Sequence, residues 1–107
     1  MKPLYIIVHG SNLPLNRDIS LLNHDFDRYE ECLEVIIKLD RIKKDEEFIE
    51  ILGDSGVIPN RLSKTQPILV CGAYLELCVE NQYKALKSQG YNAEIYLPGT
   101  LKRPKFF

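Results

Sequence analysis

The chain has 107 residues, of which 45% are hydrophobic and 27% charged, the composition of one ordinary globular domain. Its net charge of −1 provides no basic surface of the kind that binds nucleic acid or an anionic membrane, so we expect neither partner. We also expect no signal peptide or membrane span, and three cysteines without a C-x-x-C spacing favour the reducing cytoplasm over a disulfide framework or a zinc site.

A buried strand is predicted close to the start of the chain. The run Leu4–Val8 is continuously apolar and rich in β-formers, which is typical of a strand covered on both faces of a sheet. His9 and Gly10 end this run, and a polar stretch with two prolines follows as a loop. The sequence therefore places His9 at the carboxyl end of a strand.

The segment after this loop is compatible with two structures. A three-to-four spacing of apolar residues predicts a helix that begins near Asp18 or Ser20. These apolar residues are Ile19, Leu22, Phe26, Tyr29 and Leu33. The β-branched run Val35–Ile37 then favours a strand over residues 34–39. The alternative is a helix that continues to about Lys44.

The second half predicts one more helix and then a crossover unit. Asp45–Leu52 begins with acidic residues and is followed by Gly53, which predicts a short helix, and residues 54–66 form a loop. The crossover unit consists of strand Ile68–Cys71, helix Glu76–Gln89 and strand Ala93–Leu97. Gly90 ends its helix, and Pro98-Gly99 ends its last strand.

Alternation of strands and helices predicts the fold class. We expect residues 1–107 to form a single three-layer, Rossmann-like α/β domain with a small, mostly parallel sheet. Ligands of such sheets bind beyond the carboxyl ends of the strands. This rule places His9, Gly72 and Cys78 near one edge, together with Lys38 if residues 34–39 are a strand.

Cys78 falls where the first turn of the predicted helix begins. The unpaired N–H groups and the positive end of the helix dipole at such a position favour the thiolate, which is the nucleophilic form. Cys71 lies within an apolar strand and is expected to be a small buried hydrophobic residue. The sequence therefore makes Cys78 the candidate reactive thiol.

The segment Gly72–Val79 (Gly-Ala-Tyr-Leu-Glu-Leu-Cys-Val) resembles the nucleophile loop of the isochorismatase-like cysteine hydrolases, which include nicotinamidases and N-carbamoyl amidohydrolases. In that family a strand ends in Gly, the nucleophilic Cys follows six residues later, and Val comes next. The family's helix then runs to a Gly-aromatic pair, as Gly90-Tyr91 does here. Val35–Lys38 resembles the family strand that carries a catalytic Lys.

This resemblance implies a role for several residues. It makes Cys78 the nucleophile and Lys38 the cation that helps to activate it. Backbone groups at Gly72, Ala73 and Tyr74 would bind the oxyanion or the substrate, together with the N–H of Cys78. The resemblance also implies a cis peptide bond between Ala73 and Tyr74.

The family's triad includes an Asp at the end of its first strand, and here that strand ends in Val8 and His9. We therefore expect a divergent, non-catalytic member of the family that binds a small molecule or assembles as a homo-oligomer. The alternative is a small cysteine hydrolase that cleaves an amide or related C–N bond. In that alternative Cys78 is the nucleophile, and His9 or a partner chain completes the site.

No metal or cofactor is expected. His24, Asp25 and Asp27 are close in sequence, but consecutive residues of a helix point in different directions. The glycines of the chain form no phosphate-binding pattern.

Overall fold

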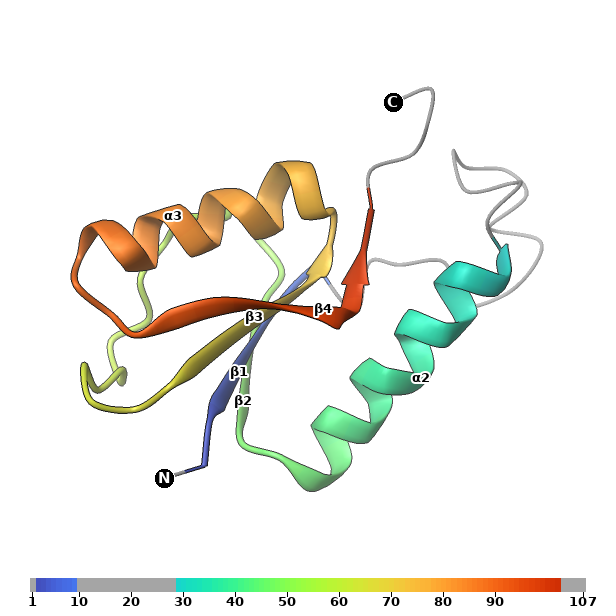
Figure 1. Ribbon diagram of the computed structural model, residues 1–107, viewed down its shortest axis with the longest axis horizontal. Coiled ribbons are helices and arrows are strands. Elements are labelled where there is room, and N and C mark those ends of the chain that lie inside the picture. Colours follow the sequence, from blue (N-terminus) through green and yellow to red (C-terminus); the bar gives the residue numbers. More distant parts are fainter. Residues whose placement is uncertain (1, 10–28, 103–107) are drawn as a thin grey trace.

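The computed structural model describes residues 2–9 and 29–102. Its elements in chain order are β1 (Leu4–Val8), α2 (Tyr29–Asp45), β2 (Phe48–Ile51), β3 (Ile68–Ala73), the π-helical turn η3 (Leu75–Val79), α3 (Glu80–Ser88) and β4 (Ala93–Leu101) (Figure 1). The predicted helix start near residues 18–20, the loop before it and the group His24–Asp27 lie outside the described residues.

The four strands form one sheet in the order β2-β1-β3-β4, and all of their pairings are parallel. The central strands β1 and β3 are in register from Leu4 beside Ile68 to Val8 beside Gly72. From this central pair the chain adds β2 on one side and β4 on the other. The predicted α/β fold with a small parallel sheet is confirmed.

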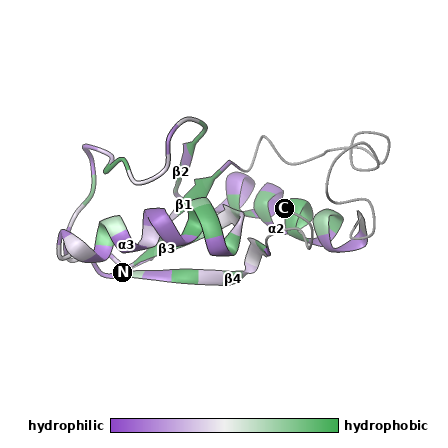
Figure 2. Ribbon diagram, turned by 90° about the horizontal axis from the view of Figure 1, so that it is seen from above, coloured by the Kyte–Doolittle hydropathy of each residue, from purple (hydrophilic) through white to green (hydrophobic). Residues whose placement is uncertain are grey.

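The helices α2 and α3 cover opposite faces of the sheet (Figure 1). The cluster on the α2 face consists of Ile7, Cys32, Val35, Leu39, Ile42, Cys71, Ala73 and Leu101. The cluster on the α3 face consists of Ile6, Val8, Ile68, Val70, Val79, Leu86 and Ala93. Neighbouring residues of β1 alternate between the two clusters, which explains why this strand is a continuous apolar run (Figure 2).

The strand predicted over residues 34–39 is wrong, because these residues lie in the middle of α2. The buried face of this helix has three-to-four spacing. Its residues are Cys32, Val35, Leu39 and Ile42. Acidic residues in the first turn and lysines in the last turn complement the helix dipole. The β-branched residues cost at most about 0.7 kcal/mol each in a helix, less than burial of an apolar side chain provides.

The helix predicted over Asp45–Leu52 is also wrong. Helix α2 ends at Asp45, and Phe48–Ile51 form β2, which pairs with β1. The Tyr5 N–H donates to the Glu47 carbonyl at 2.9 Å at the beginning of this pairing. The acidic residues 45–47, which suit the start of a helix, lie at the end of α2 and directly after it. Residues 48–51 form a strand because they pair with β1, which is distant in sequence.

The sequence predicted that the last strand ends at Pro98-Gly99. Strand β4 continues past these residues to Leu101. Its register with β3 jumps from Ile95 to Thr100, so residues 96–99 form a bulge. The Thr100 hydroxyl donates to the Tyr96 carbonyl at 2.7 Å and closes this β4 bulge. A proline has no N–H to donate to a ladder, and the bulge is a position where none is needed.

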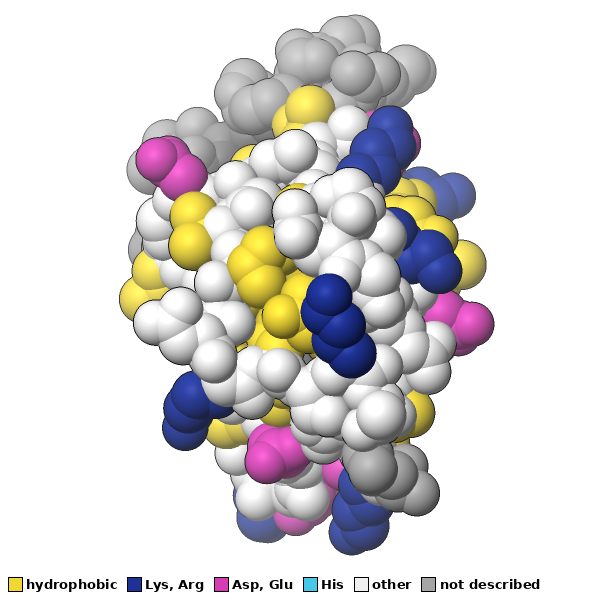
Figure 3. All heavy atoms as spheres, turned by 90° about the vertical axis from the view of Figure 1, so that its left-hand side faces the viewer, with side chains coloured by type: hydrophobic (Ala, Val, Ile, Leu, Met, Phe, Trp, Pro, Cys, Tyr) yellow, Lys and Arg dark blue, Asp and Glu magenta, His cyan; other side chains and the backbone are white. Residues whose placement is uncertain are grey.

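The surface carries charges of both signs. On the side of the molecule shown in Figure 3, hydrophobic side chains gather near the centre, with Lys or Arg and Asp or Glu side chains distributed around them. That side therefore presents no patch of a single sign. Among the helices of the described residues, none is long and apolar enough to cross a membrane.

Candidate functional site

The carboxyl ends of β1 and β3 lie side by side where the strand order changes direction. Val8 and Gly72 are register partners there, and a Cβ atom at Gly72 would lie 2.1 Å from the Val8 carbonyl oxygen. Gly72 also has a φ of +111°, which residues with a side chain rarely adopt. This glycine lets the two strands approach closely at the edge where parallel sheets bind ligands.

The turn after β3 determines the position of Cys78. The Ala73–Tyr74 peptide bond is cis, as the resemblance predicted. The Tyr74 carbonyl accepts hydrogen bonds from the N–H groups of Leu77 at 3.0 Å and Val79 at 3.2 Å. Leu77 has a non-helical φ of −126° and ψ of −107°. Regular helical geometry therefore begins after this kink, and Cys78 is the first residue beyond it.

None of the three cysteines forms a disulfide, and they differ in exposure. Cys78 is half-buried and packs against the cluster on the α3 face. Cys32 and Cys71 are buried, and burial raises the pKa of Cys71 from 9.0 to about 12. The Cys71 thiol donates a weak hydrogen bond to the Ile6 carbonyl oxygen at 3.8 Å. Because its side chain is fully buried in the core, Cys71 is the small buried residue that the sequence predicted. Cys78 is the accessible thiol of the chain.

His9 directly follows β1 and lies at the same edge of the sheet as the Cys78 turn. Its φ is +55°, and its N–H donates to the Ile51 carbonyl at 2.8 Å. The structure thus brings His9, Gly72 and the Cys78 turn to the carboxyl ends of neighbouring strands.

The structure places Lys38 in the middle of a helix and not at the end of a strand. Lys38 lies on α2, and its side chain lines two cavities between α2 and β4. Cys78 packs against the cluster on the α3 face, whereas Lys38 belongs to the helix that covers the opposite face. The strand on which the role of Lys38 was based does not exist. Tyr74 packs against the cluster on the α2 face, opposite to Cys78.

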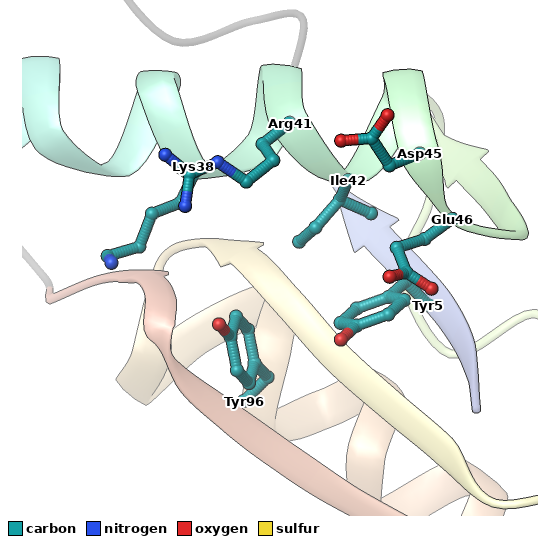
Figure 4. Close-up of a pocket in the computed structure, with 7 residues that line it drawn as sticks. All are labelled: Tyr5, Lys38, Arg41, Ile42, Asp45, Glu46 and Tyr96. Atoms are coloured by element: carbon teal, nitrogen blue, oxygen red, sulfur yellow. The ribbon is translucent and has the colours of Figure 1, made fainter. Parts of the chain in front are cut away.

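Sequence reasoning missed a cavity of about 180 Å³ between α2 and the sheet (Figure 4). Its lining residues are Tyr5, Lys38, Arg41, Ile42, Asp45, Glu46 and Tyr96. Four of these residues follow the i, i+3, i+4, i+7 spacing of one helix face. The sequence contains this spacing, but it indicates a shared helix face only if residues 34–45 form a helix. The predicted strand over residues 34–39 excluded that helix.

In the part of the chain that the structure describes, no three His, Cys, Asp or Glu side chains form a group that could hold a metal ion. The group His24–Asp27 lies outside that part. Comparisons with protein families, with curated proteins and with solved structures find no match to this chain.

Proposed function

We propose that this chain is a divergent, non-catalytic, isochorismatase-like α/β domain that binds a small molecule at the carboxyl edge of its sheet. The observation that carries the proposal is that Lys38 lies on α2, whereas Cys78 packs against the opposite, α3 face of the sheet. The likeness of Gly72–Val79 to a nucleophile loop supports the ancestry. The lost Lys-Cys pair supports the absence of catalysis.

Cysteine-dependent hydrolysis of an amide needs three things: a thiolate, a group that moves the proton to the leaving amine, and donors for the oxyanion. This chain has the thiol of Cys78, but its first strand ends without an Asp, and its Lys38 faces the other side of the sheet. General acid–base help contributes about 10²–10⁴-fold to such reactions. We infer that turnover without it is too slow to be the function.

Binding needs less than catalysis does. The switch point between β1 and β3 is where open parallel sheets form a ligand crevice. The backbone of the turn from Gly72 to Cys78 would border the ligand on one side, and His9 would border it on the other. The ligand class that this proposal names is a small amide or carboxamide-like molecule, because the inherited loop shape suits that group.

Thiol chemistry and turnover together test this proposal. Cys32 and Cys71 are buried, so iodoacetamide labelling of the native protein at pH 6–7 reports on Cys78. We expect labelling no faster than that of a peptide thiol. We also expect no product from nicotinamide or an N-carbamoyl amino acid, although these probes should shift the amide resonances of Gly72–Cys78 in an NMR titration.

The hydrolase alternative predicts a different set of results. Cys78 would label rapidly, one of the two probes would be hydrolysed, and both Cys78→Ala and His9→Ala would abolish that hydrolysis. A Ser63→Ala variant is the matched control, because Ser63 is exposed and lies in the loop before β3. Fast labelling with Cys78-dependent turnover would overturn the non-catalytic proposal.

We also propose that the chain assembles as a homo-oligomer. Leu33 and Ile37 are one turn apart on α2, and 41% and 51% of their surfaces are exposed. Two adjacent exposed aliphatic residues on one helix provide an apolar strip that a second copy of the chain would cover.

A further inference from the structure

We propose that the cavity between α2 and β4 is a second binding site, which takes a small aromatic anion through Lys38 and Arg41. The cavity has a volume of about 180 Å³ and lies on the α2 side of the sheet (Figure 4). It is therefore distinct from the carboxyl edge at Cys78, and the inference does not depend on the proposed function.

The cations supply the first argument. Lys38 and Arg41 are three residues apart on α2, and Figure 4 shows both side chains extending toward the same end of the cavity. Among the described residues, neither forms a salt bridge or a hydrogen bond. Two neighbouring positive charges repel each other, and an anion placed between them removes that repulsion. Arg and Lys are also the side chains that bind carboxylates and phosphates best.

Lys38 also borders a second cavity of about 400 Å³ farther along the groove between α2 and β4. The β4 bulge provides the opposite wall of that cavity through Leu97 and Pro98. The Lys38 ammonium group is thus accessible from both cavities. Glu31, Glu34 and Lys102 line the larger cavity as well, so it carries charges of both signs.

The aromatic walls supply the second argument. The rings of Tyr5 and Tyr96 form an edge-to-face pair with centroids 5.6 Å apart and an angle of 84° between the ring planes. Ile42 lines the same cavity from the helix. Two rings and an aliphatic side chain offer a surface for a planar apolar group, and aromatic pairs prefer such offset and edge-to-face contacts. The site therefore favours an anion attached to an aromatic ring over a bare inorganic ion.

The acidic end of the cavity limits the charge of the ligand. Asp45 and Glu46 line the cavity at the C-terminal end of α2, away from the cations. Burial, followed by the negative charge of Glu46, raises the pKa of Tyr5, so the Tyr5 hydroxyl keeps its proton and can donate a hydrogen bond. A second anionic group at the opposite end of the ligand would be repelled by these carboxylates. We therefore infer a ligand with a single anionic group, and not a polyanion.

An NMR titration of the full chain tests this proposal. Benzoate and phenyl phosphate are the aromatic anions, benzyl alcohol is the neutral analogue, and inorganic phosphate is the anion without a ring. Both aromatic anions should shift the resonances of Tyr5, Arg41 and Tyr96, and the tighter of the two identifies the anion class. Benzyl alcohol and inorganic phosphate should each bind at least about tenfold more weakly, as expected when one set of contacts is lost.

Variants separate this site from general charge effects. The double variant K38Q/R41Q should weaken both aromatic anions by about tenfold or more, which corresponds to the loss of a charge-assisted hydrogen bond. Lys84→Gln is the matched control, because Lys84 is exposed on α3 and pairs with Glu80 at 2.9 Å. It should leave the affinity unchanged. Tyr96→Leu keeps the charges and should weaken the aromatic anions but not inorganic phosphate.

Three results would overturn the proposal. The first is the absence of any shift at the cavity residues with either aromatic anion. The second is equal binding of benzyl alcohol, which would show that the charge contributes nothing. The third is unchanged affinity in K38Q/R41Q, or an equal loss in Lys84→Gln, which would place the binding elsewhere. Both substitutions of the double variant are on the helix surface or half-buried, and its spectrum reports directly whether it folds.

Discussion

Gln82 has no exposed surface, although its amide needs hydrogen-bonding partners. Its Oε1 accepts the Gly56 N–H at 2.6 Å, and its Nε2 donates to the Val57 carbonyl at 2.9 Å. Both partners belong to the long segment between β2 and β3, so one α3 side chain holds that segment against the α3 face. The neighbouring Asn81 makes a similar bond to the Ser55 hydroxyl at 2.8 Å, but at the surface.

Replacement of Gln82 by Met should therefore destabilise the fold. Met has nearly the same shape, so the loss comes from two backbone groups that lose their partners, and we expect about 2 kcal/mol in the free energy of unfolding. Urea denaturation measures this loss, and hydrogen exchange of the Gly56 amide should become faster. Asn81→Ala, on the same turn of α3, should change the stability by less than about 0.5 kcal/mol. Equal effects of the two variants would contradict the role assigned to Gln82.

Single residues were predicted unevenly from the sequence, for physical reasons. His9 and Cys78 border predictable elements, a buried apolar run and a helix after a glycine turn, and the structure places both at the predicted edge. The role predicted for Lys38 required residues 34–39 to be a strand. These residues belong to α2, so Lys38 lines a cavity between this helix and the sheet. The burial of Gln82 had no local signal, because a loop distant in sequence covers it.

At the scale of elements, local propensity failed where a long-range contact decided. The pattern of β1, β3 and α3 is carried by their own residues, and these elements were predicted. The residues of β2 have a local helix signal and form a strand only because β1 offers its free edge. The β-branched run in α2 has a local strand signal but forms a helix. Burial of the helix face with three-to-four spacing outweighs a strand preference of only a few tenths of a kcal/mol per residue.

The pairing of β1 with β3 makes a strong demand on one position. A Cβ atom at Gly72 would overlap the Val8 carbonyl, and the φ of +111° is unfavourable for any other residue. We expect Gly72→Ala to cost about 3 kcal/mol or more, because the backbone strain and the separation of the two central strands add together. Thermal and urea denaturation measure this loss.

Gly53→Ala is the matched control for that substitution. A Cβ atom at Gly53 would meet nothing within 4 Å, and its φ lies outside the left-handed region. Its stability should stay within about 0.5 kcal/mol of the parent. A Gly72→Ala protein as stable as the Gly53→Ala protein would show that β1 and β3 can separate at their carboxyl ends without loss, and the close approach would have no structural importance.

At the scale of the whole molecule, two small helical layers cover a sheet whose outer strands, among the described residues, are β2 and β4. A chain of 107 residues buries a smaller fraction of its surface than a larger enzyme does. Exposed aliphatic residues remain on α2, on the β4 bulge and after β2. Leu33 and Ile37 are adjacent on one face of α2, whereas the exposed Leu97 and Leu52 belong to separate parts of the chain. This adjacency makes α2 the surface where a second copy would gain most.

Light scattering coupled to size exclusion tests that arrangement. The parent chain should have the mass of at least two copies, and the L33E/I37E variant should have the mass of one, because four buried carboxylates at a symmetric interface would repel one another. Val57→Glu is the control, since Val57 is 60% exposed but lies in the segment between β2 and β3. Val57→Glu should leave the assembly intact.

A parent chain that stays monomeric over the whole concentration series would contradict the homo-oligomer proposal. A monomeric Val57→Glu variant would indicate that the interface lies on the α3 side of the sheet. Because Leu33 and Ile37 are exposed, the variant chains should keep the stability of the parent monomer, so a loss of mass without a loss of fold is the result that assigns the interface to α2.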